Sequence, residues 1–529
     1  EKLWLSSYPE GVPENITQPP FKSLKEMIDS CLVEYSDRIA YSNMGATLTF
    51  NQLDKMSLNF ACYLQQDLKL KKGDRVAIML PNILQYPVVL CGILRAGLVV
   101  VNVNPLYTPR ELKHQLSDSG AQSIIILDNF AHVLAEIIDE TAIEQVILTK
   151  VGDLLNFPKN HIINFVLKYI KKVIPKYKLN STVNFQKTLE KKAHQTLDPV
   201  DLSEDDLAFL QYTGGTTGLS KGAMITHKNM VFNLHQSKAW QGNLFDDVEV
   251  IIAITALPLY HIFSLQSNCL AMMLDGGENV LITNPRDFPA FVKELKKHKF
   301  VYITGVNTLY ASLLNTPGFD EIDFQDLRFT VGGGMAIQKA VSKDWEKITG
   351  QPILQAYGLT ETSPAAVVNP IDITEFSGSI GLPISSTEVS IRDDQGQNLS
   401  VGELGEICIR GPQVMLGYWE QPDETAKVML PDNWFKTGDI GRMDEQGFVY
   451  IEDRKKDMIL VSGFNVYPNE IEGVVVELDG VLEAAAIGIE NQQSGEVVKL
   501  FVVKKDPKVT KDEIYAHCKK NLTAYKMPK

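Results

Sequence analysis

Cysteine is scarce in this sequence, and no cysteine has the spacing that metal binding requires. The 529 residues include six cysteines and no Cys-x-x-Cys pair: Cys31, Cys62, Cys91, Cys269, Cys408 and Cys518. The nine histidines form no His-Glu-x-x-His motif. We therefore expect reduced thiols in the cores of a cytoplasmic protein, and no structural zinc site.

Long apolar runs are also absent. A helix needs about 20 apolar residues to span a bilayer, and the best candidate, Val88 to Leu94, is far shorter and ends at Arg95. The first residues, Glu1 to Leu5, lack the apolar core of a signal peptide. The sequence predicts a chain that does not cross a membrane and that has lost at least its initiator methionine.

Basic residues do not outnumber acidic ones. The chain has 51 Lys and Arg against 65 Asp and Glu, which gives a net charge of −14. This balance argues against a nucleic-acid partner, because nucleic-acid binding needs a basic surface. An acidic protein can still bind ATP, since local amides, a few cations and Mg²⁺ hold the phosphates. The length exceeds the roughly 250–300 residues that one core supports, so we expect two or more domains.

Strand-like and helix-like segments alternate through most of the first 450 residues. Apolar runs at 75–80, 99–103, 123–127 and 145–148 predict buried strands. Thr108, Pro109 and Glu111 have the pattern of a helix start, with Thr as N-cap, Pro at the first helical position and Glu at the third. Strands that alternate with helices predict an α/β fold with doubly wound parallel sheets.

Residues 380–450 contain short apolar runs separated by turn sequences at 393–396, 402–405 and 444–447. This sequence pattern predicts a mostly β subdomain, either a small β-barrel or a distorted sheet. The alternation resumes after residues 453–457, where Asn469 as N-cap and Glu472 predict a helix start. We predict a large domain over residues 1–452 and a small α+β C-terminal domain over residues 453–529.

A basic segment stands apart in this acidic protein. Residues 159–187 contain no acidic residue and seven lysines: Lys159, Lys168, Lys171, Lys172, Lys176, Lys178 and Lys187. On a helix, one stripe would carry Ile162, Phe165, Val166, Tyr169, Ile170, Val173 and Ile174. A basic amphipathic helix is typical of a peripheral contact with an anionic membrane, here through Lys159–Lys178 at the inner face of the cytoplasmic membrane. The alternative is a helix packed on the core with a solvated lysine face.

The strongest chemical motif is the Gly/Thr-rich stretch from Tyr212 to Gly222. Apolar residues 207–210 precede it, so we expect the loop to follow a strand. Glycines let backbone N–H groups turn toward an anion, and threonine hydroxyls add donors that can also reach Mg²⁺. Lys221 supplies a positive charge. It follows Ser220 and precedes Gly222, so the stretch does not match a Walker A loop.

This stretch resembles the phosphate loop of the adenylate-forming superfamily, which includes acyl-CoA synthetases, luciferases and peptide-synthetase adenylation domains. It differs from many members at Gly214, where they have Ser, and at Ser220, where they have Pro. The resemblance implies a binding site for the phosphates of ATP, with Thr213 also a ligand of Mg²⁺. The residues that it assigns to this loop are Thr213, Gly214, Gly215, Thr216, Thr217, Gly218 and Lys221.

Further segments resemble the superfamily's other motifs, in the same order. In residues 355–362, the resemblance assigns Tyr357 and Gly358 to adenine, Thr360 to the phosphates and Glu361 to Mg²⁺. Residues 331–335 match the glycine-rich strand end between adenine and the acyl pocket, with Gly333 on the acyl side and Gly334 and Met335 on the nucleotide side. In residues 434–439 Asp439 is assigned to the ribose hydroxyls, and in residues 453–457 Arg454 lies near the ribose and Lys456 at a hinge.

The acyl group is predicted from residues 256–265, which are apolar around a single His261. In the superfamily this stretch lines the acyl site, which assigns Tyr260 and His261 to it; a hydrogen-bonded core histidine is the alternative for His261. No acidic or basic cluster selects an amino or dicarboxylic acid, so we expect an apolar tail. Residues 102–112, 282–287 and 453–472 are similar to bacterial long-chain fatty-acid–CoA ligases, and the resemblance covers essentially the whole chain.

The resemblance implies a two-step reaction with ATP and CoA as co-substrates and Mg²⁺ as cofactor. A long-chain fatty acid is converted to acyl-AMP and then to acyl-CoA, with Thr213, Lys221, Thr360 and Glu361 as the catalytic set. In the superfamily the small domain rotates between the steps and presents Gly463 to CoA. The superfamily's adenylation lysine would lie beyond Lys529, so we expect an incomplete C-terminal domain.

Two other functions remain open. A fatty acyl-AMP ligase would pass the acyl group to a carrier protein instead of CoA. A lipid-binding membrane-surface protein could keep the nucleotide fold without catalysis, although the intact motifs argue against it. The sequence also leaves open the preferred chain length and the formation of a homodimer.

Overall fold

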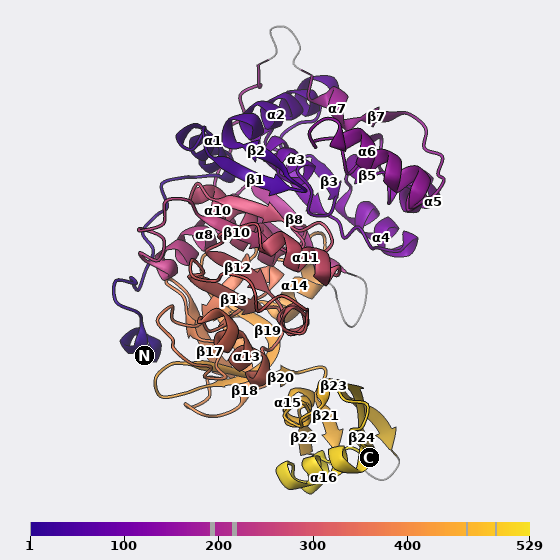
Figure 1. Cartoon of the computed structure of the whole chain (residues 1–529). Helices are drawn as coiled ribbons and strands as arrows, with labels where there is room; N and C mark the ends of the chain where they lie inside the picture. Colours follow the sequence, from indigo (N-terminus) through magenta and orange to yellow (C-terminus); the bar gives the residue numbers. More distant parts are fainter. Residues whose placement is uncertain (1, 191–195, 214–219, 462–463, 492–494) are drawn as a thin grey trace.

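Buried apolar runs form the central strands of two large, mostly parallel sheets (Figure 1). The computed structural model describes residues 2–190, 196–213, 220–461, 464–491 and 495–529. The first sheet has seven strands in the order β7-β6-β5-β3-β4-β8-β9, all parallel except β9, which is antiparallel to β8. Their bounds are β3 Arg75–Met79, β4 Val99–Asn102, β5 Ser123–Leu127, β6 Gln145–Thr149, β7 Thr182–Asn184, β8 Leu207–Thr213 and β9 Lys221–Thr226.

The second sheet has nine strands in the order β16-β15-β14-β13-β12-β10-β11-β1-β2. Its interior is parallel from β1 to β14, and antiparallel strands lie at both edges. The bounds are β1 Ile39–Asn43, β2 Ala46–Thr49, β10 Ile252–Thr255, β11 Glu278–Leu281, β12 Tyr302–Gly305, β13 Phe329–Gly333, β14 Leu354–Gly358, β15 Ala365–Val368 and β16 Leu382–Pro383. The doubly wound α/β prediction is confirmed, with antiparallel edges that the sequence pattern did not indicate.

Helices connect these strands and pack on the sheets. Every residue of α3 is buried, whereas α4 begins with the predicted cap: the Thr108 hydroxyl accepts from the Glu111 amide, and Glu111 accepts in return from the Thr108 amide. The helices of the large part are α1 Leu24–Glu34, α2 Phe50–Cys62, α3 Gln85–Arg95, α4 Pro109–Ser119, α5 Ala131–Ile137, α6 Lys159–Phe165, α7 Phe185–Thr188, α8 His227–Gln241, α9 Ile262–Ser264, α10 Ala271–Leu274, α11 Phe288–Leu295, α12 Asn307–Leu314, α13 Lys339–Thr349 and α14 Pro422–Val428.

A third sheet is antiparallel and has the order β17-β18-β19-β20. Its strands are β17 Glu388–Arg392, β18 Gly405–Arg410, β19 Phe435–Met443 and β20 Val449–Arg454. The turn sequences predicted at 393–396, 402–405 and 444–447 lie between or at the ends of these strands. Of the two predicted alternatives, the distorted sheet is the one found, and β17 and β20 are its edges.

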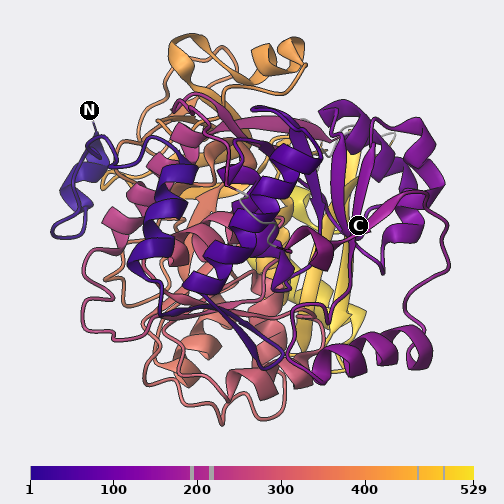
Figure 2. The same cartoon turned by 90° about the horizontal axis from the view of Figure 1, so that it is seen from above.

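The C-terminal part has its own sheet and its own core, and lies behind the large part when viewed from above (Figure 2). The sheet order is β22-β21-β24-β23, with β21 Ile459–Val461, β22 Phe464–Val466, β23 Val481–Asn491 and β24 Gly495–Lys504. Helices α15 Pro468–Val476 and α16 Lys511–Asn521 pack on it and bury Ile471, Val475 and Cys518.

The predicted start of α15 is wrong. The helix begins at Pro468, with Tyr467 as the N-cap and no side-chain cap. The Asn469 amide donates instead to Asp453 Oδ2 at 2.9 Å, and Glu472 accepts from the Ala486 amide of β23 at 2.8 Å. Proline is favoured at the first helical position, and a carboxylate distant in sequence satisfies an amide that a local cap would otherwise hold.

The helix predicted through Ile174 in the basic segment is too long. Helix α6 continues as the π-helical segment η4, Val166–Ile170, and ends there. Ile163 and Leu167 contact the core, whereas Ile162, Phe165 and Ile170 are exposed. The apolar stripe therefore faces outward together with the lysines.

The N-terminal residues pack against the last segments of the large domain-like part, which lie far from them in the sequence. Trp4 is buried, Ser7 donates to the Gln446 carbonyl at 2.8 Å, and Tyr8 donates to the Pro383 carbonyl at 2.6 Å. At Gly447 a Cβ would lie 2.4 Å from the Trp4 backbone. We call residues 3–8 the N-terminal strap.

All six cysteines are buried and unpaired, as predicted. Within the described residues, the structure contains no helix with the length and apolarity needed to cross a membrane.

Candidate active site

One large cavity lies where β8, β9, β13, β14, β19 and the end of β20 converge. Its volume is about 1350 Å³, and both polar and apolar side chains line it. Parallel strands bring their carboxyl ends to one edge of a sheet, which is where α/β proteins bind ligands. The fold thus gathers residues that are up to 354 positions apart, from Asn102 to Lys456, around one space.

The hairpin of β8 and β9 brings Thr213 and Lys221 opposite each other. Lys221 forms an ion pair with Glu424 of α14, and its Nζ lies 4.9 Å from the centre of the Tyr418 ring. The pairing lowers the pKa of the Glu424 carboxyl to about 2, chiefly through the hydrogen bond from Lys221. The ammonium group of Lys221 is therefore already paired with the carboxylate of Glu424 in this structure.

Glu361 is a buried carboxylate in the cavity wall. It lies in the turn after β14, where Gly358 is required because a Cβ would be 1.8 Å from the Pro364 carbonyl oxygen. Tyr418 donates a hydrogen bond to Glu361 Oε1 at 2.7 Å, and burial raises the pKa of Glu361. A cation placed here would recover the solvation that the carboxylate loses on burial.

Asp439 is held by two side chains at the opposite wall. The Tyr357 hydroxyl donates to Asp439 Oδ2 at 2.6 Å, and Arg454 Nε lies 3.3 Å from Oδ1. Burial raises the pKa of Asp439, while the Tyr357 hydrogen bond and the Arg454 charge oppose that rise. The ionised carboxylate can accept hydrogen bonds from a ligand's hydroxyl groups.

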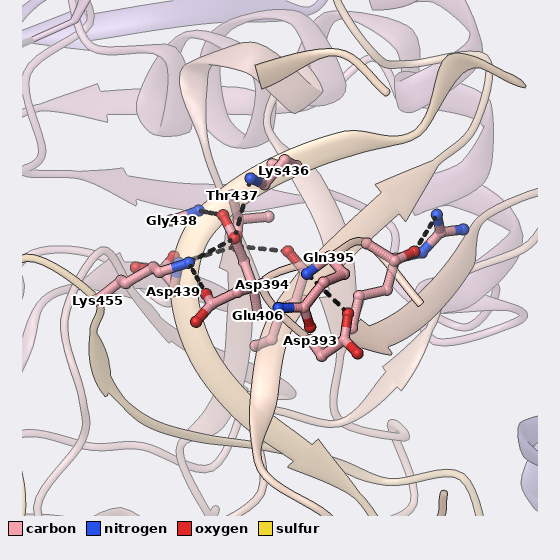
Figure 3. Close-up of polar contacts among 12 residues, drawn as sticks. Asp393, Asp394, Gln395, Glu406, Lys436, Thr437, Gly438, Asp439 and Lys455 are labelled. Carbon is pink, nitrogen blue, oxygen red and sulfur yellow. Dashed lines mark hydrogen bonds and ion pairs between the residues drawn. The ribbon is translucent and has the colours of Figure 1, made fainter. Parts of the chain in front are cut away.

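The position of Asp439 depends on a bulge in the third sheet. Between the pairs Cys408–Lys436 and Glu406–Ile440, β18 has one residue and β19 has three. Side-chain hydrogen bonds replace the backbone hydrogen bonds that are missing between β18 and β19 at this bulge. Glu406 Oε1 accepts from the Gly438 amide at 3.1 Å, and Thr437 donates to the Ile407 carbonyl at 2.8 Å. Figure 3 shows Glu406 beneath this turn and pointing toward Lys455.

Lys455 links the third sheet to the C-terminal part. Its Nζ lies 3.3 Å from Glu406 Oε2 and 2.6 Å from Asp394 Oδ1, and its amide donates to the Gly438 carbonyl at 2.9 Å (Figure 3). Because Lys455 immediately follows β20, these contacts fix the first residue of the connection to β21. We call Lys455, Glu406 and Asp394 the clasp.

The apolar side of the cavity begins at the end of β13. A Cβ at Gly333 would lie 2.7 Å from the Ala356 carbonyl oxygen and 3.2 Å from the Phe263 ring, so only glycine leaves this passage open. His261 and Tyr260 line the same space. The His261 ring is accessible from the cavity, and surrounding protein atoms lower its pKa. It is therefore not the buried core histidine of the alternative interpretation.

Most residues assigned to the site from sequence meet in this cavity. Its lining includes Thr213, Lys221, Tyr260, His261, Gly333, Gly334, Tyr357, Gly358, Thr360, Glu361, Asp439, Arg454 and Lys456. Met335 is half exposed and does not line it. Gly214, Gly215, Thr216, Thr217, Gly218 and Gly463 lie outside the described residues.

Tyr418 and Glu424 are site residues that the sequence did not indicate. Their partners, Glu361 and Lys221, are 57 and 203 positions away. No local spacing predicts such contacts, because they depend on the packing of the segment 411–428 against β9.

Comparison with known proteins assigns the chain to one class of enzyme. The family model described as AMP-binding enzyme matches residues 29–419, and the AMP-binding enzyme C-terminal domain matches residues 470–529. A long-chain-fatty-acid–CoA ligase of Escherichia coli O157:H7 is 54% identical over 100% of this chain and 94% of its own. The Bacillus subtilis protein of the same name is 37% identical with the same coverage.

Solved structures agree. ATP-bound MatB from Rhodopseudomonas palustris has a TM-score of 0.80 and 26% identity, over 96% of this chain and 94% of that one. This chain belongs to the AMP-binding enzyme family.

Proposed function

We propose that this chain is a long-chain-fatty-acid–CoA ligase. The observation that carries the proposal is that one cavity joins the carboxylates and cations around β14 and β19, through the gap at Gly333, to a space with an aromatic wall. The family membership and the 54% identity to the Escherichia coli relative support it.

In the proposed reaction the fatty acid carboxylate attacks the α-phosphorus of ATP and expels pyrophosphate. The thiolate of CoA then attacks the acyl carbon and expels AMP. No covalent bond to the protein is needed, so the side chains position the reactants and neutralise charge. We assign Lys221, Thr213 and Thr360 to the phosphates, Tyr357 to adenine, and Asp439 and Arg454 to the ribose.

The residues fit a Mg²⁺ ion at Glu361. Hard cations prefer oxygen ligands, and the buried Glu361 carboxylate and the Thr213 hydroxyl offer them in the cavity. The bound ion would neutralise charge that develops on the phosphates.

We further propose that the large domain ends at residue 452 and that Lys456 lies at a hinge. The clasp holds Lys455 to the large part, so the first residue free to change its backbone angles without breaking those contacts is the next one. Hinge residues absorb such changes away from the chemistry.

A peripheral membrane contact is proposed for the basic segment. Ile162, Phe165, Tyr169 and Ile170 are 56%, 56%, 57% and 65% exposed, and exposed lysines surround them. Exposed apolar side chains with basic neighbours suit an anionic bilayer surface.

Formation of acyl-CoA tests the main proposal. The full-length protein, supplied with ATP, Mg²⁺, CoA and a series of unbranched fatty acids, should release AMP and form acyl-CoA. If it exchanges pyrophosphate with ATP but forms no thioester with free CoA, the carrier-protein ligase is correct instead. If it releases no AMP with any acid, the enzyme proposal fails.

A further inference from the structure

Beyond the carboxyl end of the proposed acyl site, the cavity follows one face of β13. Phe329, Val331 and Gly333 line it, whereas the intervening Thr330 and Gly332 contact Trp345 and Ile337 on the other face. Because a strand rises about 3.3 Å per residue, the path from Gly333 to Phe329 is about 13 Å long. A ligand that enters at Gly333 therefore reaches deep between the nine-stranded sheet and helix α8.

The deep end has an aromatic wall on the sheet side. Tyr302 of β12 pairs with Phe329 of β13, and their rings stack with centroids 5.4 Å apart. Trp240 of α8 also lines the cavity, but its indole N–H already donates to the Asn369 carbonyl at 2.9 Å. These three side chains present carbon surfaces that suit a hydrocarbon chain.

The same end of the cavity also has a polar wall, which adjoins the aromatic one where Ser267 hydrogen-bonds to Tyr302. Gln266 of η5 (Leu265–Leu270) is 1% exposed, and its Nε2 donates to Ser237 Oγ of α8 at 2.9 Å. Ser267 donates to Gln266 Oε1 at 2.8 Å. All three line the cavity, although a pocket for a plain hydrocarbon chain has no use for a buried amide and two hydroxyls.

The cluster retains one unused donor. A serine hydroxyl has one hydrogen to donate and two lone pairs. Ser237 Oγ accepts from Gln266, and within the described residues its own O–H has no acceptor. A donor that loses water without gaining a partner is costly, so an unsubstituted chain that fills this end leaves the Ser237 hydroxyl unsatisfied.

We propose that Ser237 and Gln266 form a subsite for an oxygen substituent on the acyl chain, so that hydroxylated fatty acids are among the preferred substrates. This inference rests on the proposed ligase function and deepens it. The substituent's oxygen accepts from Ser237, and the rest of the chain lies against Tyr302, Phe329 and Trp240. The depth of the cluster requires the substituent to be in the middle of the chain, far from the carboxylate.

The test compares kcat/KM for hexadecanoic acid with kcat/KM for hexadecanoic acids that carry one hydroxyl at successive positions. We expect the ratio of hydroxylated to plain acid to peak at a mid-chain position. Ser237→Ala should lower that peak roughly threefold to tenfold, as expected for one hydrogen bond, and Gln266→Leu should lower it as well. Thermal unfolding checks that each variant folds; Ser237→Ala keeps the test intact if Gln266→Leu does not.

Ser264→Ala is the matched control. Its hydroxyl is buried and donates to the Leu257 carbonyl at 2.9 Å, but it does not line the cavity. It should leave the ratio unchanged. A ratio that is flat along the chain, or a peak that survives both substitutions, overturns the subsite. Such results would still leave turnover of plain hexadecanoic acid intact, whereas absence of that turnover would reject the ligase function itself.

Discussion

At the scale of single residues, the Tyr357 hydroxyl tunes the carboxylate that we assign to the ribose. Asp439 must be ionised to accept two hydroxyls, yet burial raises its pKa. The hydrogen bond from Tyr357 opposes that rise by stabilising the charged form. The same ring would meet adenine, so the hydroxyl and the ring have separable roles.

The variant Tyr357→Phe separates the role of the hydroxyl from the role of the ring. The ring is kept, but the pKa of Asp439 rises further, so the acid limb of kcat/KM for ATP should move to higher pH. Above that limb the loss should be about tenfold to a hundredfold, the value of one hydrogen bond to a charged group. The pH profile of ATP–pyrophosphate exchange measures both. Tyr8→Phe, which removes a hydroxyl that donates to the Pro383 carbonyl and not to Asp439, should not move the limb; an unmoved limb in Tyr357→Phe would contradict the proposed role.

Asp128 is a buried carboxylate with no function in the proposed mechanism. One of its oxygens has no hydrogen-bond partner, and burial raises its pKa from 3.8 to about 6. The folded protein therefore holds a proton on Asp128 between about pH 4 and 6 that the unfolded chain releases. Stability contributed by the neutral form is lost as the pH rises through this window.

Asp128→Asn should therefore stabilise the protein at neutral pH. The gain should approach 2–3 kcal/mol, from about two units of pKa shift, and it should vanish as the pH falls toward 4. Thermal unfolding midpoints of both proteins across this pH range measure the effect. The exposed Asp37→Asn serves as the control and should show no such trend. If Asp128→Asn is less stable than the wild type at every pH, the Asp128 carboxylate makes a stabilising contact in the folded protein.

At the scale of elements, the bulge between β18 and β19 determines where Asp439 points. Bulges redirect side chains next to functional sites. Here the Glu406 carboxylate accepts from the Gly438 amide in place of a ladder carbonyl, and it also holds Lys455. One buried side chain thus connects the proposed ribose site to the connection with the C-terminal part.

Glu406→Ala should impair both the proposed ribose site and the connection to the C-terminal part. Without the carboxylate the turn at Gly438 loses its acceptor and Lys455 keeps only Asp394, so KM for ATP should rise about tenfold to a hundredfold, from a charged hydrogen bond worth roughly 1.5–3 kcal/mol. Glu406→Gln retains an acceptor oxygen and should recover most of the loss. Steady-state kinetics with varied ATP, run for each half-reaction, would measure the KM for ATP of both variants. Equal defects in both variants would mean that the charge matters and the hydrogen bond to Gly438 does not.

The elements also show how far the sequence can be interpreted alone. The runs that became β3, β4, β5 and β6 were predictable because buried parallel strands are continuously apolar, and α4 was predictable from its cap. The start of α15 was not, because its amide partner, Asp453, is 16 positions away. The helix of the basic segment was predicted too long, since the apolar stripe continues after the helix ends at Ile170.

The same distinction holds for the site. Motif residues such as Tyr357 and Asp439 were predicted from a family resemblance, and the fold brings them within hydrogen-bonding distance. Tyr418, Glu424 and Glu406 act through contacts with distant segments, and no local pattern marks them. The polar wall at Ser237 and Gln266 likewise exists only when α8 and η5 pack together.

At the scale of the whole molecule, charge is distributed unevenly. The net charge is −14, but the exposed segment 159–178 is basic. Each lysine near an anionic membrane contributes about 1 kcal/mol. The protein should therefore approach a bilayer through α6 and η4, which lie on the outer side of the seven-stranded sheet (Figure 1).

Changing Lys168, Lys171 and Lys172 together to Glu should weaken binding to phosphatidylglycerol vesicles by at least about 100-fold, from about 1 kcal/mol per lysine. Vesicle co-sedimentation measures it. Changing Lys511, Lys519 and Lys520 of α16 to Glu alters the net charge equally on a different exposed surface, and should have little effect. Equal binding by the first variant and the wild type would refute the membrane contact.

The N-terminal strap also bears on how the chain is made. A ribosome releases the amino end first, and domains tend to fold as they emerge. Yet Ser7 and Tyr8 bond to residues 439 and 375 positions later, so the strap finds its place only after nearly the whole large part has been translated. The strap therefore closes late in synthesis. Until then the hydrophobic face of Trp4 has no site at Gly447 to receive it, and a nascent chain would expose it to chaperones for most of its synthesis.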